Sequence, residues 1–268
     1  MLFGVSSWAY MGEGCAAEAV VDELLDAGFT ALSFSTSPLG RLAPSELAAL
    51  AGHVCDRGAP VTLHGLASIE RAELGRIVEP FLPVLRCVTC DPSWNAHPTG
   101  WQYAAGELAR AAHRALVLTE GTGVRVGIED FPINAEAVEH FRADLAPVLG
   151  DPRLGILIDI GHMHMRLSGR GYFAGMSVAE HLARVPLEII EVHVHDNDGR
   201  GDQHAPLGSG TVDFAAVAAG LNAAGFAGVA TIEIVPAQHG AQTVAARLAM
   251  ARACLQRWRE VWSAVAGG

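Results

Sequence analysis

Short apolar runs alternate along the chain with longer stretches in which apolar residues recur every three or four positions. Several of the short runs are almost continuously apolar, which is typical of parallel strands covered on both faces. The candidate strands span residues 2–8, 31–36, 61–66, 85–90, 125–131, 154–160, 189–195 and 229–235.

The intervening stretches have the spacing of amphipathic helices. Residues 16–29 place Val20, Val21 and Leu24 on one face, as a half-buried helix requires. Pro44 marks the first turn of the next helix, because proline is favoured there. We expect helices over residues 16–29, 44–58, 69–80, 102–119, 135–149, 176–185, 212–224 and 240–265.

Eight strand–helix units predict a single (β/α)8 TIM barrel, an α/β fold, formed as one domain by residues 1–268. An open doubly wound sheet that binds a dinucleotide is the weaker interpretation, because no G-x-G-x-x-G follows any strand. In such barrels the chemistry lies at the carboxyl ends of the strands. The polar residues at those ends are therefore the candidates for function.

The amino-acid composition excludes several classes of enzyme. All 18 basic residues are arginine, and the chain has no lysine. This excludes Schiff-base and pyridoxal phosphate chemistry, which need a protein amine, and also a P-loop. We expect no nucleotide cofactor. Because there is no basic leader followed by an apolar stretch and no apolar run long enough to span a bilayer, we expect a cytoplasmic protein without a membrane partner.

Five cysteines, an odd number in a long chain, do not indicate a disulfide framework. Cys87 and Cys90 form a C-x-x-C, but they lie in a candidate strand, where residues three apart point to opposite faces. No second C-x-x-C completes a zinc site. We interpret both as buried thiols.

Ionisable side chains lie at the carboxyl ends of several candidate strands. They are His64, Glu129 and Asp130, Asp159 and His162, His193, His195 and Asp196, and Glu233. Carboxylates in apolar surroundings are costly to bury without a counter-charge, and a divalent cation is the obvious one here. The set Glu129, Asp159, His193 and Glu233 would converge from the last four strands and suits Mn²⁺, Mg²⁺, Co²⁺ or Zn²⁺.

Periodicity leaves two points open on the seventh candidate strand. His195 lies on the same side as His193, because side chains repeat every two residues, so either could be the ligand. Glu191 also falls on that side, deeper in the barrel, and the sequence identifies no group that would neutralise it.

Five short motifs occur in order along the chain and resemble those of the xylose isomerase-like barrel superfamily, which contains sugar-phosphate isomerases and epimerases and class II AP endonucleases. The motifs are GIED at 127–130, D-x-x-H at Asp159–His162, H-x-x-D at His193–Asp196, D-x-H-x-P-L-G-x-G at Asp202–Gly210 and the IE that ends at Glu233. Each is weak alone, but the five occur in the right order and at the ends of the expected strands, and the resemblance extends over essentially the whole chain.

The resemblance implies metal ligands at Glu129, Asp159, His193 and Glu233, and it favours His193 over His195. It places His162, Asp202 and His204 where the endonucleases hold an additional metal and where the isomerases line the substrate pocket. His64 matches a further ligand of the endonucleases. The chain departs from their pattern at Cys90–Asp91, where a second histidine is expected.

The resemblance therefore implies an enzyme of carbohydrate metabolism, an isomerase or epimerase that moves a proton next to the carbonyl of a sugar or polyol-derived ketone. Glu129 and Glu233 would act as base and acid, through an enediolate, with one divalent cation. Two alternatives are a class II AP endonuclease-like phosphodiesterase and a non-catalytic barrel that binds a sugar or metal. The net charge of −11 opposes a nucleic acid partner. Homo-oligomerisation is left open.

Overall fold

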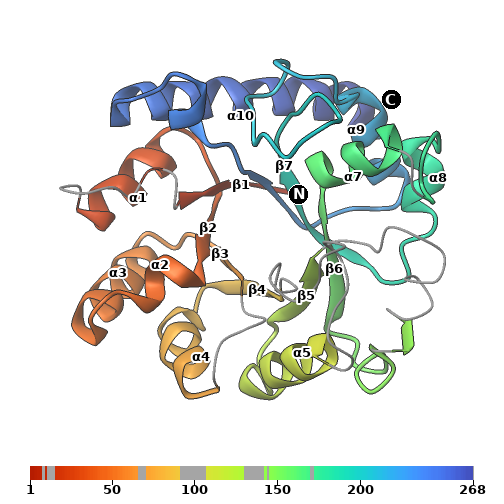
Figure 1. Cartoon of the computed structure of the whole chain (residues 1–268). Coiled ribbons are helices and arrows are strands. Elements are labelled where there is room, and N and C mark those ends of the chain that lie inside the picture. Colours follow the sequence, from red (N-terminus) through yellow and green to blue (C-terminus); the bar gives the residue numbers. More distant parts are fainter. Residues whose placement is uncertain are drawn as a thin grey trace.

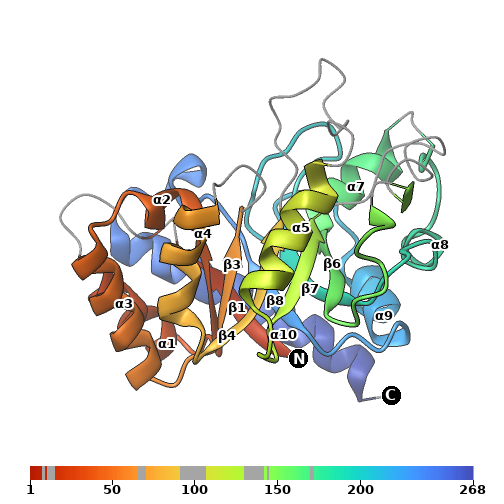
Figure 2. The same cartoon turned by 90° about the horizontal axis from the view of Figure 1, so that it is seen from below.

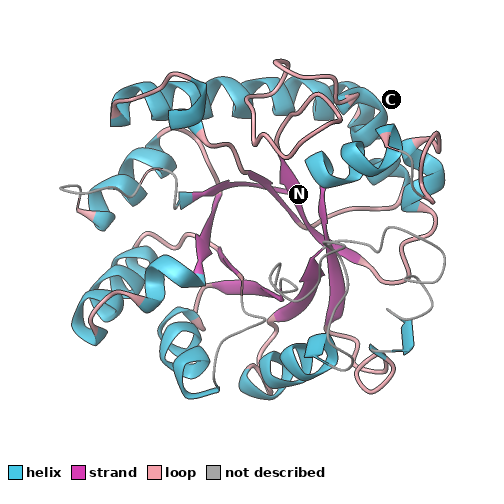
Figure 3. Cartoon of the chain, in the orientation of Figure 1, coloured by secondary structure: helices cyan, strands magenta, loops and turns pink. Residues whose placement is uncertain are grey.

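The computed structural model describes residues 1–7, 10, 16–65, 71–90, 107–129, 142–143, 145–169 and 172–267. Within them, eight parallel strands form a closed barrel in chain order, and the helices surround it (Figures 1 and 3). Pairing of Leu2 with Val229 closes the ring between the first strand and the last. The predicted (β/α)8 architecture is confirmed.

The strands are short, and they match the predicted runs closely. Their bounds are β1 Leu2–Ser6, β2 Ala31–Ser35, β3 Val61–His64, β4 Leu85–Cys90, β5 Arg125–Glu129, β6 Leu154–Asp159, β7 Ile189–Val194 and β8 Val229–Ile232. The main difference is at the ends, since β8 stops one residue before Glu233. The backbone N–H of Glu233 still donates to the carbonyl of Val194, so β7 holds this residue in line with the strand.

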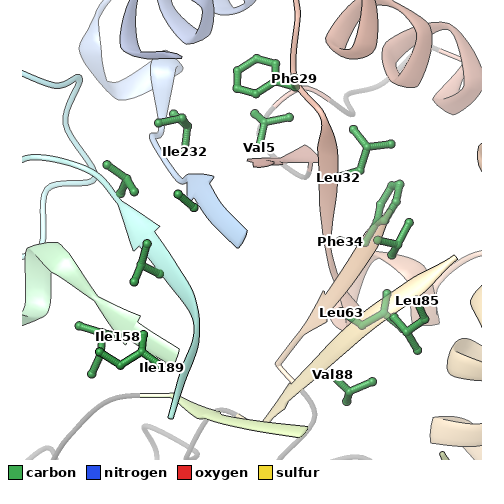
Figure 4. Close-up of a cluster of buried hydrophobic side chains, with 14 of the residues drawn as sticks. Val5, Phe29, Leu32, Phe34, Leu63, Leu85, Val88, Ile158, Ile189 and Ile232 are labelled. Atoms are coloured by element: carbon green, nitrogen blue, oxygen red, sulfur yellow. The ribbon is translucent and has the colours of Figure 1, made fainter. Parts of the chain in front are cut away.

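The two faces of the barrel wall differ in polarity. Apolar side chains such as Val5, Leu32 and Ile232 lie on the outer side of the strands, toward the helices (Figure 4). Because neighbouring residues of a strand point to opposite faces, the intervening residues face the barrel interior. Much of that interior is polar and buried, and it includes Ser33, Thr62, Thr89, Glu191, His193 and Thr231.

The helices cover the outside of the barrel. Their bounds are α1 Ala17–Asp26, α2 Thr36–Gly40, α3 Pro44–Asp56, α4 Arg71–Val78, α5 Glu107–Leu118, α7 Ile160–Ser168, α8 Val178–Leu182, α9 Phe214–Ala223 and α10 Val244–Ala266, with 3-10 turns at Glu79–Phe81 and Pro236–His239. Seen from the side, α7 lies toward the opposite end of the barrel from the N-terminus (Figure 2). Among the described residues, no helix combines the length and the apolarity that a bilayer crossing requires.

Two of the helices formed by the described residues, α2 and α7, were not predicted. Each begins at the residue that follows a strand, with no loop between them. The sequence pattern therefore shows no boundary between strand and helix at these two places. Residues 135–141 and 144 of the predicted helix at 135–149 lie outside the described residues, as do residues 102–106 of the predicted helix at 102–119. Cys55, Cys87, Cys90 and Cys254 are free thiols, and Cys87 and Cys90 are buried as expected.

Candidate active site at the carboxyl end of the barrel

The junction of β6 and α7 places a carboxylate in front of a helix. Asp159 is the last residue of β6 and the N-cap of α7, where its Oδ1 accepts the backbone N–H of His162 at 2.7 Å. Aspartate is a favoured N-cap because its oxygen satisfies an N–H that the helix leaves free. Burial raises the pKa of Asp159, but His162 and His195 outweigh burial and hold this pKa well below its ordinary value.

Side chains from the neighbouring strands converge on Asp159. His193 is fully buried on β7, and the register of β6 and β7 pairs it with Asp159. Its Nδ1 lies 2.7 Å from Oε2 of Glu233, 3.6 Å from Oε1 of Glu129 and 3.9 Å from Oδ2 of Asp159. We call Glu129, Asp159, His193 and Glu233 the first group.

The charges of the first group are strongly coupled. Burial lowers the pKa of His193, but Glu233 and Glu129 raise it well above its ordinary value. Burial raises the pKa of Glu233, but His193 and other histidines nearby lower it to about 2. The contact between Nδ1 of His193 and Oε2 of Glu233 is an ion-pair contact, and by strict hydrogen-bond geometry neither ring nitrogen of His193 has a partner within the described part of the chain.

His64 borders the first group from β3. Its Nε2 lies 3.4 Å from Oε2 of Glu129, and its ring meets the ring of His193 edge-on with centroids 4.8 Å apart. His64, Glu129 and His193 together offer three ligand atoms within 4.8 Å of one another. The structure therefore places His64 beside the predicted ligands.

A second group of polar side chains lies next to the first. Oδ2 of Asp202 is 3.2 Å from Nε2 of His162 and 3.2 Å from Nε2 of His204. The ring of His195 stacks on the ring of His204 with centroids 4.1 Å apart. Burial lowers the pKa of His204, but Asp202 and other carboxylates raise it to about 9. We call His162, His195, Asp202 and His204 the second group.

His195 links the two groups. Its Nε2 lies 3.0 and 3.1 Å from the two carboxylate oxygens of Asp159, and its ring is fully buried. Gly161 makes room for this ring, because a Cβ at Gly161 would overlap Cε1 of His195. The two-residue periodicity of the strand indicated His195 only as an alternative to His193 for the metal ligand. The structure instead places it in the second group, just beyond the end of β7.

A single carboxylate organises the loop that carries Asp202 and His204, two members of the second group. We call residues 197–212 the β7 loop. Asp196 is buried, and its two oxygens accept the backbone N–H groups of Asn197, Gly208, Gly210 and Val212 at 2.8–3.1 Å. Asp196 also pairs with Ala205 through two backbone hydrogen bonds. The sequence marked Asp196 as part of a motif but gave no indication of this role.

The structure brings together all eight residues that the sequence singled out for the site, which form or border the two groups. These are His64, Glu129, Asp159, His162, His193, Asp202, His204 and Glu233. Asp91 and Asp130 lie outside the described residues. Glu191, left unexplained by the sequence, lies beneath the first group at hydrogen-bond distance from neutral donors.

The first group has the composition and geometry of a site for a divalent cation. Asp159, His193 and Glu233 each offer a ligand atom within 4.8 Å of the others, as do Glu129, Asp159 and His162. Buried carboxylates need a counter-charge, and the ring nitrogens of His193 lack hydrogen-bond partners among the described residues. The oxygen-rich set suits Mn²⁺, Mg²⁺, Co²⁺ or Zn²⁺.

Residues 85–254 match the family model described as xylose isomerase-like TIM barrel. The chain belongs to this family. Among curated proteins, an uncharacterized protein of Methanocaldococcus jannaschii is 30% identical over 119 residues, which cover 43% of this chain and 39% of that protein. The chain thus matches less than half the length of the curated relatives found.

Several solved structures resemble the chain over almost its whole length. D-psicose 3-epimerase with D-tagatose, from Clostridium cellulolyticum H10, is 13% identical with a TM-score of 0.71, over 98% of this chain and 99% of that chain. The IOLI protein with a bound zinc atom is 16% identical with a TM-score of 0.66, over 99% of both chains. At these identities the likeness shows a shared fold.

Proposed function

We propose that the protein is a metal-dependent isomerase or epimerase that acts on a sugar or sugar-derived ketone by proton transfer next to the carbonyl. The observation that carries this proposal is a pair of buried glutamates around one histidine. Glu129 Oε1 and Glu233 Oε2 lie 3.6 and 2.7 Å from Nδ1 of His193, and the two residues are only 5% and 7% exposed.

Two carboxylates at one site can serve as base and acid. One removes the proton from the carbon next to the carbonyl, and the other returns a proton to the opposite face, which inverts that carbon. Glu129 and Glu233 are the residues that hold and move this proton. A divalent cation held by Glu129, Asp159, His193 and Glu233 would supply positive charge that stabilises an enediolate.

The second group lines the same end of the barrel and gives the substrate its polar contacts. His162, His204 and Asp202 can bind hydroxyl groups of a sugar, since an imidazole and a carboxylate together offer donors and acceptors. The epimerase and zinc-binding structures with the same fold support a sugar ligand and a metal.

A second candidate function rests on the second group as a site for another cation. Its four residues all offer ligand atoms within 4.8 Å of one another, which would suit hydrolysis of a phosphodiester. The net charge of −11 disfavours DNA as the substrate, because binding to DNA requires neutralisation of several phosphates. We therefore rank carbonyl chemistry first.

The test is solvent deuterium incorporation with a panel of unphosphorylated and phosphorylated ketoses in D₂O, with Mn²⁺-loaded protein. We expect product with deuterium at the isomerised or epimerised carbon. Glu129→Gln and Glu233→Gln should each lower turnover by about 100-fold or more, as expected for a lost general acid or base. Metal content is measured in every variant, because both glutamates are also proposed ligands.

Glu188→Gln is a matched control, since Glu188 is exposed, pairs with Arg125 and precedes β7 at the other end of the barrel. It should turn over normally, and His64→Gln should cost much less than either glutamate variant. Near-normal turnover by metal-loaded Glu233→Gln would contradict the two-carboxylate mechanism. Turnover without deuterium in the product would indicate hydride transfer instead.

A further inference from the structure

Glu191 is a carboxylate in the interior of the barrel, below the first group. It lies on β7 two residues before His193 and is fully buried. Burying a charge in this way is costly unless the carboxylate is well hydrogen-bonded. Its presence in the barrel interior therefore needs a specific explanation.

Four neutral side chains surround Glu191 as donors. Oε1 accepts from Thr62 Oγ1 at 2.9 Å and Thr231 Oγ1 at 2.7 Å, while Oε2 accepts from Cys87 Sγ at 3.1 Å and Thr89 Oγ1 at 3.4 Å. A carboxylate accepts hydrogen bonds at both oxygens, and each oxygen of Glu191 has two such donors. The donors come from β3, β4 and β8, and they fix the carboxylate rigidly across the barrel.

The ring of His193 lies between Glu191 and the three carboxylates of the first group. Nδ1 faces Glu233, Glu129 and Asp159, whereas Nε2 faces Oε1 of Glu191 across 3.9 Å. Within the described part of the chain, Nε2 has no hydrogen-bond partner, although it is completely buried. The two nitrogens of the ring therefore have distinct surroundings, the proposed cation site on one side and Glu191 on the other.

We propose that Glu191 is a positioning residue that acts through His193: its charge, 3.9 Å from Nε2, favours the ring tautomer that carries its proton on Nε2, so that the Nδ1 lone pair faces the cation. This inference rests on the proposed cation site. Histidines that bind metals generally donate the other ring N–H to a carboxylate or carbonyl, which fixes the ring and strengthens it as a ligand. The hydroxyl and thiol donors hold Glu191 in place, and they are neutral. A positively charged donor would compete with His193 for the carboxylate.

The experiment measures binding of Zn²⁺ alone, by competition with a chromophoric chelator. All variants carry Asp202→Asn and His204→Ala, which remove two of the four ligand side chains of the second group and so weaken it as a competing zinc site. We expect Glu191→Gln to weaken zinc binding by about 10- to 100-fold, the usual effect of losing an outer partner of a ligand. In a His193→Ala background the same change should weaken binding by less than about threefold, because Glu191 acts through that ring.

Thr62→Val is the matched control. It removes one donor from Glu191 but keeps the carboxylate and its other partners, so zinc affinity should stay within about threefold. A second readout is independent of affinity: in the zinc-loaded protein, ¹H–¹⁵N spectra of the histidine side chains should show a slowly exchanging Nε2–H on His193. We expect Glu191→Gln to accelerate its exchange with water or abolish the signal.

Unchanged zinc affinity in Glu191→Gln, or an equal loss in the His193→Ala background, would overturn the proposal. Should Glu191→Gln not fold, Glu191→Asp replaces it, because this variant keeps the charge but withdraws it from Nε2 by one methylene. A loss of about fivefold or more supports the proposal, and unchanged affinity contradicts it. These readouts need no turnover, so an inactive enzyme that shows them would refute the proposed function and leave this inference standing.

Discussion

Replacing Asp196 by alanine should loosen the β7 loop. Its carboxylate accepts four backbone N–H groups, from Asn197 at 2.9 Å, Gly208 at 2.8 Å, Gly210 at 2.9 Å and Val212 at 3.1 Å. A hydrogen bond to a charged acceptor contributes about 1.5–3 kcal/mol, so a simple sum is about 6–12 kcal/mol. The sum overstates the cost, because the bonds act as a unit and water can reach N–H groups that are only partly buried.

We therefore expect Asp196→Ala to lower the free energy of unfolding by about 3–5 kcal/mol, measured by denaturant titration. Hydrogen exchange of the amides of Gly208, Gly210 and Val212 should accelerate by at least about 100-fold, since each 1.4 kcal/mol corresponds to about a factor of ten. Asp196→Asn should be nearly as damaging, because its NH₂ group would face backbone donors that need an acceptor.

Asp198→Ala is the control for this experiment. Asp198 is the next acid along the chain, but it is exposed, and its carboxylate accepts only the nearby N–H of Arg200 at 3.0 Å among the hydrogen bonds shown by the described residues. Its loss should cost less than about 1 kcal/mol. If Asp196→Ala and Asp198→Ala had equal effects on stability and on amide exchange, the assignment of Asp196 as the anchor of the loop would be wrong.

Three further predictions follow from the site. Gly161→Ala should lower the free energy of unfolding by about 1–3 kcal/mol, because the new Cβ would overlap the ring of His195. In a His195→Ala background, denaturation curves should show a smaller loss. Equal losses in both backgrounds would contradict the packing argument. Chelation of the metal should abolish turnover while far-UV circular dichroism stays unchanged, because the apolar layer of the barrel does not depend on the ion; unfolding on chelation would refute this. At physiological salt the protein should neither bind nor incise an abasic duplex in a gel assay, and robust metal-dependent nicking would favour the phosphodiesterase instead.

The barrel could be predicted from the sequence because its signal is local. Each strand is a short apolar run, and several carry an ionisable residue at the carboxyl end, so Glu129 and Asp159 could be assigned to one end of the barrel. The helix α7 was missed because Asp159 both ends a strand and caps a helix. The D-x-x-H at Asp159–His162 was interpreted only as a family motif, although an aspartate before a helical pattern also indicates the start of a helix.

The contacts of Glu191 and His195 could not be predicted in the same way. The donors Thr62 and Thr89 reach Glu191 from strands more than a hundred residues earlier, and threonine in a strand gives no indication of its partner. His195 lies beyond Val194, the last residue of β7, where a two-residue period no longer fixes the direction of a side chain.

The polar interior of the barrel divides unequally between the two halves of the chain. The first group comes from residues 129–233 alone, a contiguous stretch, whereas Thr62, Cys87 and Thr89, which hold Glu191, come from β3 and β4. Recombination with another barrel between β4 and β5 would therefore transplant the entire ligand set and leave its supporting donors behind. In such a chimera Glu191 would stay buried but would keep only Thr231 among the four side-chain donors described above. A replacement for β1–β4 must therefore supply new hydrogen-bond donors to Glu191 from its third and fourth strands.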